Sequence, residues 1–323
     1  MRNQRGERGL SERELVRWIR GQLRYDKRVV QIGPGDDTAL VAGPSRRTLV
    51  AIDTIAEGVD FTIGRGSDAR RIAEATPEEI GRKALAVNLS DIAAMGGIPA
   101  WCMASVTLRE GLGAAFARGL TRGLLHLADK YECPLVGGDV TGWRGGVVVT
   151  VAIGGTAAGR RAITRSGARP GDVVVVTGAL GGSILGKHLA FTPRVAEGIW
   201  LARHGSPSAM IDISDGLGVD AAHIADESGV AIQIDEAAIP VSAAARELAR
   251  LDGKTALCHA IADGEDFELL FTMSNKAAAK AARWPFKTRL TVIGRVARGR
   301  GVTLLRTDGR KERIDAEGYQ HFG

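Results

Sequence analysis

Cysteine is scarce in this sequence. The three cysteines among 323 residues, Cys102, Cys133 and Cys258, lie far apart and form no C-x-x-C pair. Small secreted domains depend on several disulfides, and structural zinc sites need paired cysteines or histidines at short spacing. The sequence therefore predicts neither a disulfide framework nor a zinc site, and it favours a reducing cytoplasm.

Long apolar runs are also missing. No uninterrupted apolar stretch approaches the ~20 residues that span a bilayer. The arginine-rich N-terminus has no apolar segment of the kind that a secretory signal carries. A hydrophobic content of 45% and a charged content of 25% are those of an ordinary globular chain. We therefore expect a soluble cytoplasmic protein with no membrane partner.

The basic excess of the chain is concentrated in its first 28 residues. The formal net charge is +6, and the stretch SERELVRWIRGQL predicts an amphipathic helix that Ser11 caps, with Glu14 three residues later. Arginines on such a helix are typical of a solvated face, so we predict no nucleic-acid partner. The alternative, a nucleic-acid binder, predicts salt-sensitive binding that disappears without residues 1–28.

The stretch VVVVTGALGGSILGKH resembles a phosphate-binding P-loop. Gly181 to Lys187 fit G-x-x-x-x-G-K, but His188 stands where a P-loop needs the Ser or Thr that ligates Mg2+. The first glycine of the frame also lies about five residues too far from the strand end. We interpret the stretch as a strand that turns into a helix, from about Gly182 to Leu189.

Strands and helices alternate along the rest of the chain. Strands are predicted at 48–52, 101–108, 147–155 and 172–178, and a helix at 112–128. Another helix begins at Thr76, with Pro77 at its first position and Glu79 completing a capping box. The second half predicts a helix at 216–227 and a final strand pair around LTVIGRV and VTLLRT.

The polar segment RRAITRSGARPGD marks a domain boundary. We therefore predict a two-domain α/β (α+β) protein, divided into residues 1–158 and residues 159–323.

A recurring feature is an apolar run that stops at an aspartate beside glycine, serine or threonine. A single such aspartate usually caps a helix or forms a turn, but their number here indicates a shared purpose. GEDFELLF shows the reverse order, with acids before the strand. The strand-end acids lie in GDDTALV, VAIDT, NLSD, LVGGDVTG and IDISDG, at Asp36, Asp37, Asp53, Asp91, Asp139, Asp212 and Asp215.

Carboxylates that converge repel one another unless cations hold them together. Without histidine or thiolate partners they favour Mg2+, a hard ion that prefers oxygen ligands. Mg2+ completes its shell with water and phosphate oxygens, and Gly137-Gly138 beside Asp139 would let backbone amides approach a phosphate. The sequence therefore predicts chemistry that depends on Mg2+ and ATP and uses no P-loop.

Seven motifs occur in a fixed order: GDDTALV, DT-x-x-EGVDF, KALAVNLSDIAAMGG, LVGGDVTG, RSGARPGD, MIDISDGL and GEDFELLF. This set resembles thiamine-monophosphate kinase, a family of the aminoimidazole-ribonucleotide-synthetase-like ATP-binding superfamily. The resemblance implies a homodimer whose N-terminal sheets pair into a barrel and whose C-terminal α/β domain closes each site. It also implies direct in-line transfer of the ATP γ-phosphoryl group to thiamine monophosphate, which gives thiamine diphosphate.

The resemblance assigns roles to individual residues. The implied Mg2+ ligands are Asp36, Asp37, Asp53, Asp91, Asp139, Asp212 and Asp215. ATP would contact Gly138, Asp139, Arg165 and Ser214. The thiamine end of the acceptor would contact Glu265 and Tyr319, with its phosphate near Asp60. The residues expected to act in phosphoryl transfer itself are Asp37, Asp53, Asp139, Asp212 and Arg165.

Two positions depart from the family pattern. Ala51-Ile52 stands where the family usually has Ser-Thr, which removes a hydroxyl ligand for Mg2+. Asp60 stands where the family usually has a histidine that contacts the substrate phosphate, and a carboxylate repels that phosphate unless a cation intervenes. Two alternatives therefore stay open: a nucleotide-binding paralogue with impaired catalysis, and a kinase of the same superfamily that acts on another phosphate acceptor.

Overall fold

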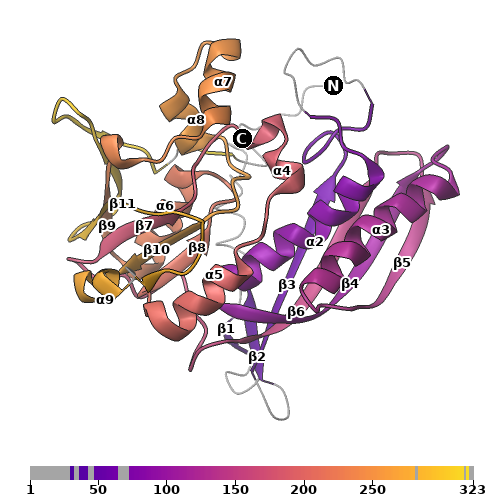
Figure 1. Cartoon of the computed structure of the whole chain (residues 1–323), viewed down its shortest axis with the longest axis horizontal. Coiled ribbons are helices and arrows are strands. Elements are labelled where there is room, and N and C mark those ends of the chain that lie inside the picture. The colour runs from indigo at the N-terminus through magenta and orange to yellow at the C-terminus, as the bar shows by residue number, and fades with distance from the viewer. Residues whose placement is uncertain are drawn as a thin grey trace, which may run out of the picture.

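The computed structural model describes residues 30–32, 36–42, 47–64, 73–280, 283–315 and 318–319. The helix predicted from Ser11 lies outside these residues. Within them the chain forms two sheets, with the first half on the right of Figure 1 and the second half on the left. None of the described helices combines the length and apolar character that a bilayer span requires.

The first sheet has the strand order β1-β2-β3-β6-β4-β5. Its strands are β1 (Val30–Ile32), β2 (Ala39–Ala42), β3 (Arg47–Ala56), β4 (Gly97–Arg109), β5 (Leu135–Trp143) and β6 (Val148–Ala157). Neighbours run antiparallel except β4 and β5, which are parallel and joined by α3 (Ala114–Lys130). A parallel pair needs such a crossover connection, and α3 supplies it.

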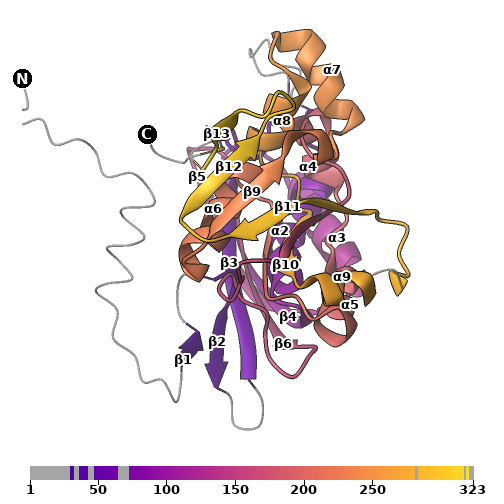
Figure 2. The ribbon, with the colours of Figure 1, turned by 90° about the vertical axis from the view of Figure 1, so that its left-hand side faces the viewer.

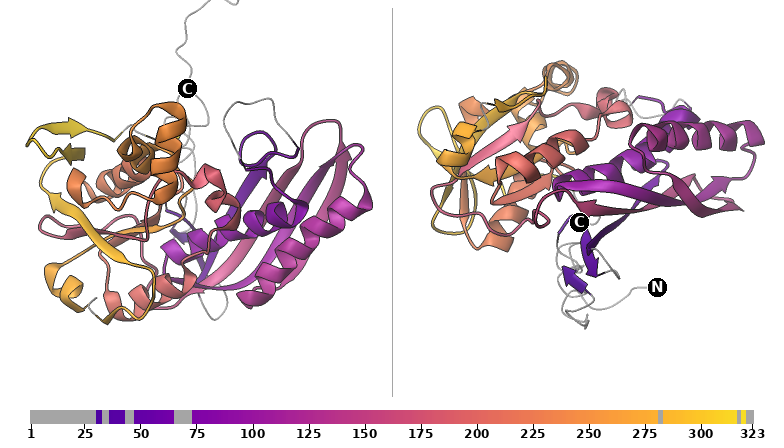
Figure 3. Two further views of the ribbon diagram at one scale, coloured as in Figure 1. Left: turned by 45° about the horizontal axis from the view of Figure 1, so that its top comes forward. Right: turned by 60° about the horizontal axis from the view of Figure 1, so that its bottom comes forward.

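Helix α2 (Pro77–Ala94) packs with α3 over one face of this sheet, as Figure 3 shows. The predicted start of α2 is confirmed. The Thr76 side chain accepts a hydrogen bond from the Glu79 amide, the Glu79 carboxylate accepts one from the Thr76 amide, and Pro77 is the first helical residue. These contacts pair amide groups that an uncapped helix end would leave without partners.

The opposite face of the first sheet carries exposed apolar side chains. Ile52 on β3 pairs through Ala152 on β6 with Met103 on β4, and cross-strand partners point to the same face. The side chains of Ile52 and Met103 are 66% and 45% exposed, and Trp143 on β5 is 46% exposed. No helix of the described chain is packed over this open face in Figure 3.

The second sheet has the order β13-β12-β9-β11-β7-β10-β8. Its strands are β7 (Val173–Thr177), β8 (Ala209–Asp212), β9 (Ala231–Asp235), β10 (Leu269–Met273), β11 (Leu290–Ala297), β12 (Gly301–Leu305) and β13 (Lys311–Arg313). Its main helices are α6 (Leu217–Ser228), α7 (Ala243–Asp252) and α8 (Ala256–Ala262). α6 contacts β9 and β12, and α7 packs against α8 at the top of Figure 2. The shorter helices are α4 (Lys187–Ala190), α5 (Val195–Trp200) and α9 (Asn275–Lys280).

Two predictions for the second half are wrong. The strands β11 and β12 do not pair with each other, because β9 lies between them, antiparallel to β11 and parallel to β12. This placement buries Ile232 and Ile234 of β9 completely. The helix predicted from Gly182 to Leu189 is divided at Gly186, whose φ of 134° leaves the helical region, into a 3-10 turn at Ser183–Leu185 and the short α4.

The two halves share a hydrophobic core. Leu89 and Ile92 of α2 belong to the same buried cluster as Met210 of β8 and Phe271 of β10. A second cluster fills the space between the second sheet and α6. Because α2 contacts both β3 and β8, it fixes the first half against the second.

The contact between α2 and α3 depends on glycine. A Cβ atom added at Gly123 would lie 1.8 Å from the carbonyl oxygen of Glu78. Gly123→Ala should therefore lower the free energy of unfolding by about 1–3 kcal/mol in urea titration, because overpacking outweighs the ~1 kcal/mol that alanine gains in helix propensity. Gly142→Ala on β5, where nothing lies within 4 Å, should change it by less than about 0.5 kcal/mol. Equal effects of the two substitutions would contradict this account of the packing.

Candidate active site

A pocket of about 410 Å³ is lined by residues from both halves of the chain. This volume is in the range of small-molecule sites. Eleven of the residues predicted from the sequence line it: Asp36, Asp37, Asp53, Asp60, Asp91, Arg165, Asp212, Ser214, Asp215, Glu265 and Tyr319. Segments that are distant in the sequence thus meet at one place.

Local structure explains how the aspartates reach the pocket. β2 pairs only with residues 47–50 of β3, so Asp53 lies further along, where β3 has lost that neighbour. Alternation along β3 turns Asp53 to the same side as the buried Ala51 and Ile55, toward α2. Asp91 comes from α2, and Asp212 is the last residue of β8.

Three carboxylates form the centre of the pocket. Oxygen atoms of Asp37, Asp91 and Asp212 all lie within 4.8 Å of one another. Asp53 shares a hydrogen bond with Asp91, and the Ser90 hydroxyl donates to Asp212. Burial, followed by the charges of Asp53 and Asp212, raises the pKa of Asp91 well above its ordinary value. Burial and the charge of Asp37 raise the pKa of Asp212 in the same way.

Arg165 offsets part of this negative charge. Its guanidinium donates two hydrogen bonds to Asp37, at 3.2 Å from Nε and 3.0 Å from Nη2. Its backbone amide donates to the Asp36 carboxylate at 2.5 Å. Burial nevertheless raises the pKa of Asp36 to about 6. One guanidinium therefore does not neutralise a group of five carboxylates.

This donor set fits a hard divalent cation. The ligand atoms are carboxylate oxygens, several are buried, and they lie close enough to share an ion. A bound cation would remove the repulsion that raises the pKa values of these aspartates. Asp37, Asp53, Asp91 and Asp212 are the residues that could hold it.

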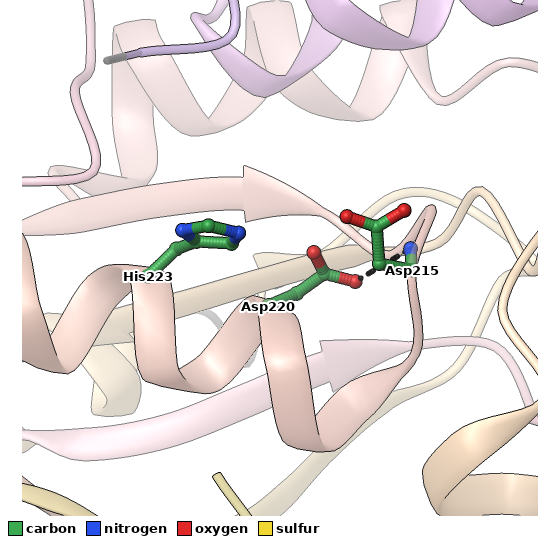
Figure 4. A group of neighbouring side chains, drawn as sticks. All are labelled: Asp215, Asp220 and His223. Carbon is green, nitrogen blue, oxygen red and sulfur yellow. Dashed lines mark hydrogen bonds between the residues drawn. The ribbon is translucent and has the colours of Figure 1, made fainter. Parts of the chain in front are cut away.

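A second group with metal-ligand atoms lies at the start of α6 (Figure 4). Ligand atoms of Asp215, Asp220 and His223 lie within 4.8 Å of one another. The Asp220 carboxylate accepts hydrogen bonds from the amides of Asp215 and Gly216, both at 3.1 Å. Asp220 thereby fixes the turn that carries Asp215 to the pocket.

Asp60, Glu265 and Tyr319 also line the pocket. The Asp60 carboxylate accepts a hydrogen bond from the Ala56 amide at 2.7 Å, which closes the turn after β3. Glu265 forms an ion pair with the buried Lys83 of α2. The Tyr319 amide donates to the carbonyl oxygen of Asp215 at 2.9 Å, which holds Tyr319 beside the turn that carries Asp215.

Two predicted site residues lie elsewhere. Gly138 and Asp139 are on β5, at the edge of the first sheet, and do not line the pocket. The register Thr54–Thr150–Ser105–Asp139 places the Asp139 side chain on the open face of the sheet. Asp53 is turned to the other face, so one copy of the chain does not bring these two aspartates together.

The P-loop-like stretch does not offer its lysine to the pocket. Lys187 donates to Glu268 at 3.1 Å and to Asp266 at 3.4 Å, and both carboxylates are buried. The rejection of a P-loop is consistent with these contacts. Ile184, in the preceding 3-10 turn, does line the pocket.

Sequence reasoning missed the residues that hold the aspartates in place. Lys83, Val87 and Asp91 recur every four residues and Ser90 precedes Asp91, so one stripe of α2 lies toward the site. This periodicity was the available signal for Lys83 and Ser90. No comparable pattern pointed to Asp220, apart from its place in the first turn of a predicted helix.

Comparison with known proteins agrees with this geometry. Residues 35–160 match the family model for the N-terminal domain of AIR synthase related proteins. The thiamine-monophosphate kinase of Rhodopirellula baltica is 33% identical over 96% of this chain and 97% of its own length. That of Salmonella typhimurium is 35% identical over 93% of this chain and 95% of its own. A solved structure of AaThiL complexed with AMPPCP and TMP has a TM-score of 0.81, 31% identity and complete coverage of both chains.

Two sheets with an acidic pocket between them, in a chain that carries this N-terminal domain, define a member of the AIR synthase related class. Within that class, the identity over nearly the whole chain is decisive. The chain belongs to the thiamine-monophosphate kinase family.

Mg2+ should stabilise the protein more at neutral than at acidic pH. Because the folded pKa of Asp36 is raised from 3.8 to about 6, the metal-free folded state binds more protons than the unfolded state between these values. Its free energy of unfolding should therefore fall as the pH rises through this window. A Mg2+ ion bound by the deprotonated aspartates should reverse that loss.

Urea titration with excess Mg2+ or with a chelator, at about pH 5 and about pH 7.5, measures this difference. Asp212→Asn should lose most of the Mg2+ effect. Asp129→Asn, at an exposed position on α3, should keep it. Equal stabilisation by Mg2+ at both pH values, or in Asp212→Asn and the unaltered chain, would contradict the assignment of the cation site.

Proposed function

We propose that this protein transfers the γ-phosphoryl group of ATP to thiamine monophosphate, giving thiamine diphosphate and ADP. The observation that carries the proposal is the convergence of Asp37, Asp53, Asp91 and Asp212 with Arg165 in one pocket. Family membership and the AMPPCP and TMP bound to the related AaThiL support the choice of the two substrates.

The reaction makes few demands on a general base. An acceptor phosphate monoester is already largely ionised at neutral pH, because its second pKa is about 6. One of its oxygens forms a bond to the γ-phosphorus while the bond from that phosphorus to the β-bridging oxygen breaks, and ADP leaves. The protein must therefore align two polyanions and balance their charge.

The pocket supplies groups for both tasks. Asp36, Asp37, Asp53, Asp91, Asp212 and Asp215 are the proposed Mg2+ ligands, and the bound cation would neutralise phosphate oxygens during transfer. Arg165, held by Asp37, is proposed to meet the phosphates of ATP, and Ser214 to contact the nucleotide. Glu265 and Tyr319 are proposed to contact the thiamine end.

The two departures from the family pattern are less severe than the sequence alone indicates. Ile52 lines the pocket but is 66% exposed on the open face, whereas Asp53 faces the other side of β3, so a hydroxyl at position 52 would point away from the Asp53 side. The Asp60 carboxylate is engaged by the Ala56 amide, and Lys83 donates to the Asp60 carbonyl oxygen at 2.6 Å. The Asp60 carboxylate is thus held by a main-chain donor, and Lys83 fixes the turn that carries it.

The open face of the first sheet supports a homodimer. Exposed Ile52, Met103 and Trp143 would be covered if the first sheets of two copies paired into a barrel. Asp139 lies on that face, so we place Gly138 and Asp139 at the partner's ATP rather than at that of their own chain. In this arrangement residues 1–158 bind ATP and Mg2+ and form the dimer, and residues 159–323 close the site. The three free cysteines suit a cytoplasmic location.

The direct test is turnover by the purified full-length protein with ATP, Mg2+ and thiamine monophosphate. Thiamine diphosphate and ADP should form in equal amounts, and Asp212→Asn should lower kcat by more than about 100-fold because a direct cation ligand is lost. Asp129→Asn should match the unaltered protein. Nucleotide binding without product would favour the impaired paralogue, and product from a different phosphate acceptor would replace the proposed substrate.

Mixed dimers test the placement of Asp139. Asp139→Asn and Asp212→Asn should each be inactive alone, because each removes a ligand from every site. If the partner supplies Asp139, a dimer with one copy of each variant contains one intact site, and a random equal mixture recovers roughly a quarter of the unaltered activity. No recovery, with mixed dimers demonstrated by differential tags, would place Asp139 at its own chain's site.

A further inference from the structure

Lys83 is a completely buried lysine whose position the reaction outlined above does not explain. Its side chain has no exposed surface, and it does not line the pocket. A buried ammonium group is costly unless it is paired and hydrogen-bonded. Here the Nζ atom donates to the carbonyl oxygen of Asp60 at 2.6 Å and to the Glu265 carboxylate. Lys83 therefore joins two segments that line the same end of the pocket.

The two segments come from different halves of the chain. Asp60 lies in the turn after β3, and Glu265 lies in the connection between α8 and β10. Helix α2 carries Lys83 between them. Among the described residues, Asp60 and Glu265 share no hydrogen bond with each other. The Lys83 ammonium group is therefore what links them.

The segment with Glu265 has a backbone that needs outside support. Glu265 and Phe267 have φ values of 52° and 49°, in the left-handed region that residues with a Cβ rarely adopt. Such conformations cost on the order of 1–3 kcal/mol each and persist where the surroundings hold them. The Glu265 amide donates to the Ser214 carbonyl oxygen at 2.6 Å, which fixes the main chain. The Lys83 ion pair fixes the direction of the side chain.

The histidine that the described residues place near Lys83 cannot replace it as a cation. His188 lies close by, but burial and the charge of Lys83 lower its pKa to about 4, so it is neutral near pH 7. Its Nδ1 atom is hydrogen-bonded to the Ser183 carbonyl oxygen at 2.9 Å. Burial raises the pKa of Glu265, and Lys83 opposes that shift and favours the ionised carboxylate.

We propose that Lys83 is a positioning residue for the phosphate acceptor. It holds the Glu265 carboxylate and the Asp60 turn at a fixed separation across the acceptor end of the pocket, and it touches neither substrate. The inference rests on the proposed kinase function and adds a residue that determines acceptor binding. It predicts that loss of Lys83 affects the acceptor far more than ATP.

Lys83→Met tests this, because methionine fills similar space without the charge or the donors. The kcat/KM for thiamine monophosphate should fall by up to about 100-fold, mostly through KM, because a displacement of about 1 Å has effects of this size. The KM for ATP should stay within about twofold. Equal increases in both KM values would overturn the proposal. Lys83→Gln keeps an N–H donor for Asp60. Its kcat/KM for thiamine monophosphate should therefore lie between those of Lys83→Met and the unaltered protein.

A double-mutant cycle with Glu265→Gln separates positioning from general destabilisation. If Lys83 acts through Glu265, Lys83→Met should lower kcat/KM by less than about threefold in the Glu265→Gln background. Fully additive losses would contradict the proposal. Lys187→Met is the matched control, since Lys187 pairs with Asp266 and Glu268 in the same connection. Lys187→Met should lower thermal stability and change the KM for ATP and the KM for thiamine monophosphate in the same proportion. A selective rise in the KM for thiamine monophosphate in this control would also contradict the proposal.

Hydrogen exchange gives a readout that does not need activity. In Lys83→Met, amides of residues 57–64 and 263–268 should exchange at least about tenfold faster, while those of β8 stay unchanged. Failure of the unaltered protein to phosphorylate thiamine monophosphate would refute the kinase function but leave this result interpretable. Unchanged exchange in both segments would refute the positioning role, whatever the substrate.

Discussion

Repulsion among Asp37, Asp91 and Asp212 is the constraint on which the arrangement of both halves depends. Two ionised oxygens within 4.8 Å of each other would repel by at least about 3.5 kcal/mol at an effective dielectric constant of about 20. Arg165 pairs with Asp37 and reduces this energy without removing it. The remaining repulsion is confined to the pocket. A large buried core on each side of the pocket holds the fold against it.

Helix α2 holds Asp91 of this carboxylate cluster in position. One stripe of the helix carries Lys83, Val87 and Asp91 toward the pocket, while Leu89 and Ile92 enter the core shared by the two sheets. The close approach of α3 at Gly123 leaves α2 little freedom to shift. The same helix therefore sets the positions of Lys83 and Asp91 at the site and the packing of the core. A change in packing on one side of α2 would move Asp91 on the other.

Much of the fold could be predicted because local signals agreed with the structure. The capping box at Thr76 and the three strands predicted in the first half carry short-range patterns. The expectation that the site aspartates end strands is met by Asp212 but is wrong for Asp91, which lies in α2, and for Asp53 and Asp139, which lie inside β3 and β5. The pairing of β9 with both β11 and β12 could not be predicted, since apolar alternation marks a strand and does not identify its neighbours. The placement of Asp139 depends likewise on sheet register, which decides the face that a residue occupies.

Lysines show most clearly where sequence patterns stop being informative. Lys187 stands in a glycine-rich frame typical of phosphate binding, yet its ammonium group is used by Asp266 and Glu268. Lys83 stands in an ordinary helical stretch, yet it contacts Asp60 and Glu265, two residues that line the pocket. The acidic residues that each lysine contacts lie more than 20 residues away in the sequence. The lysine and these acids therefore balance each other's charge only in the folded chain. The function of a buried cation therefore follows from the acids that surround it and not from the motif that contains it.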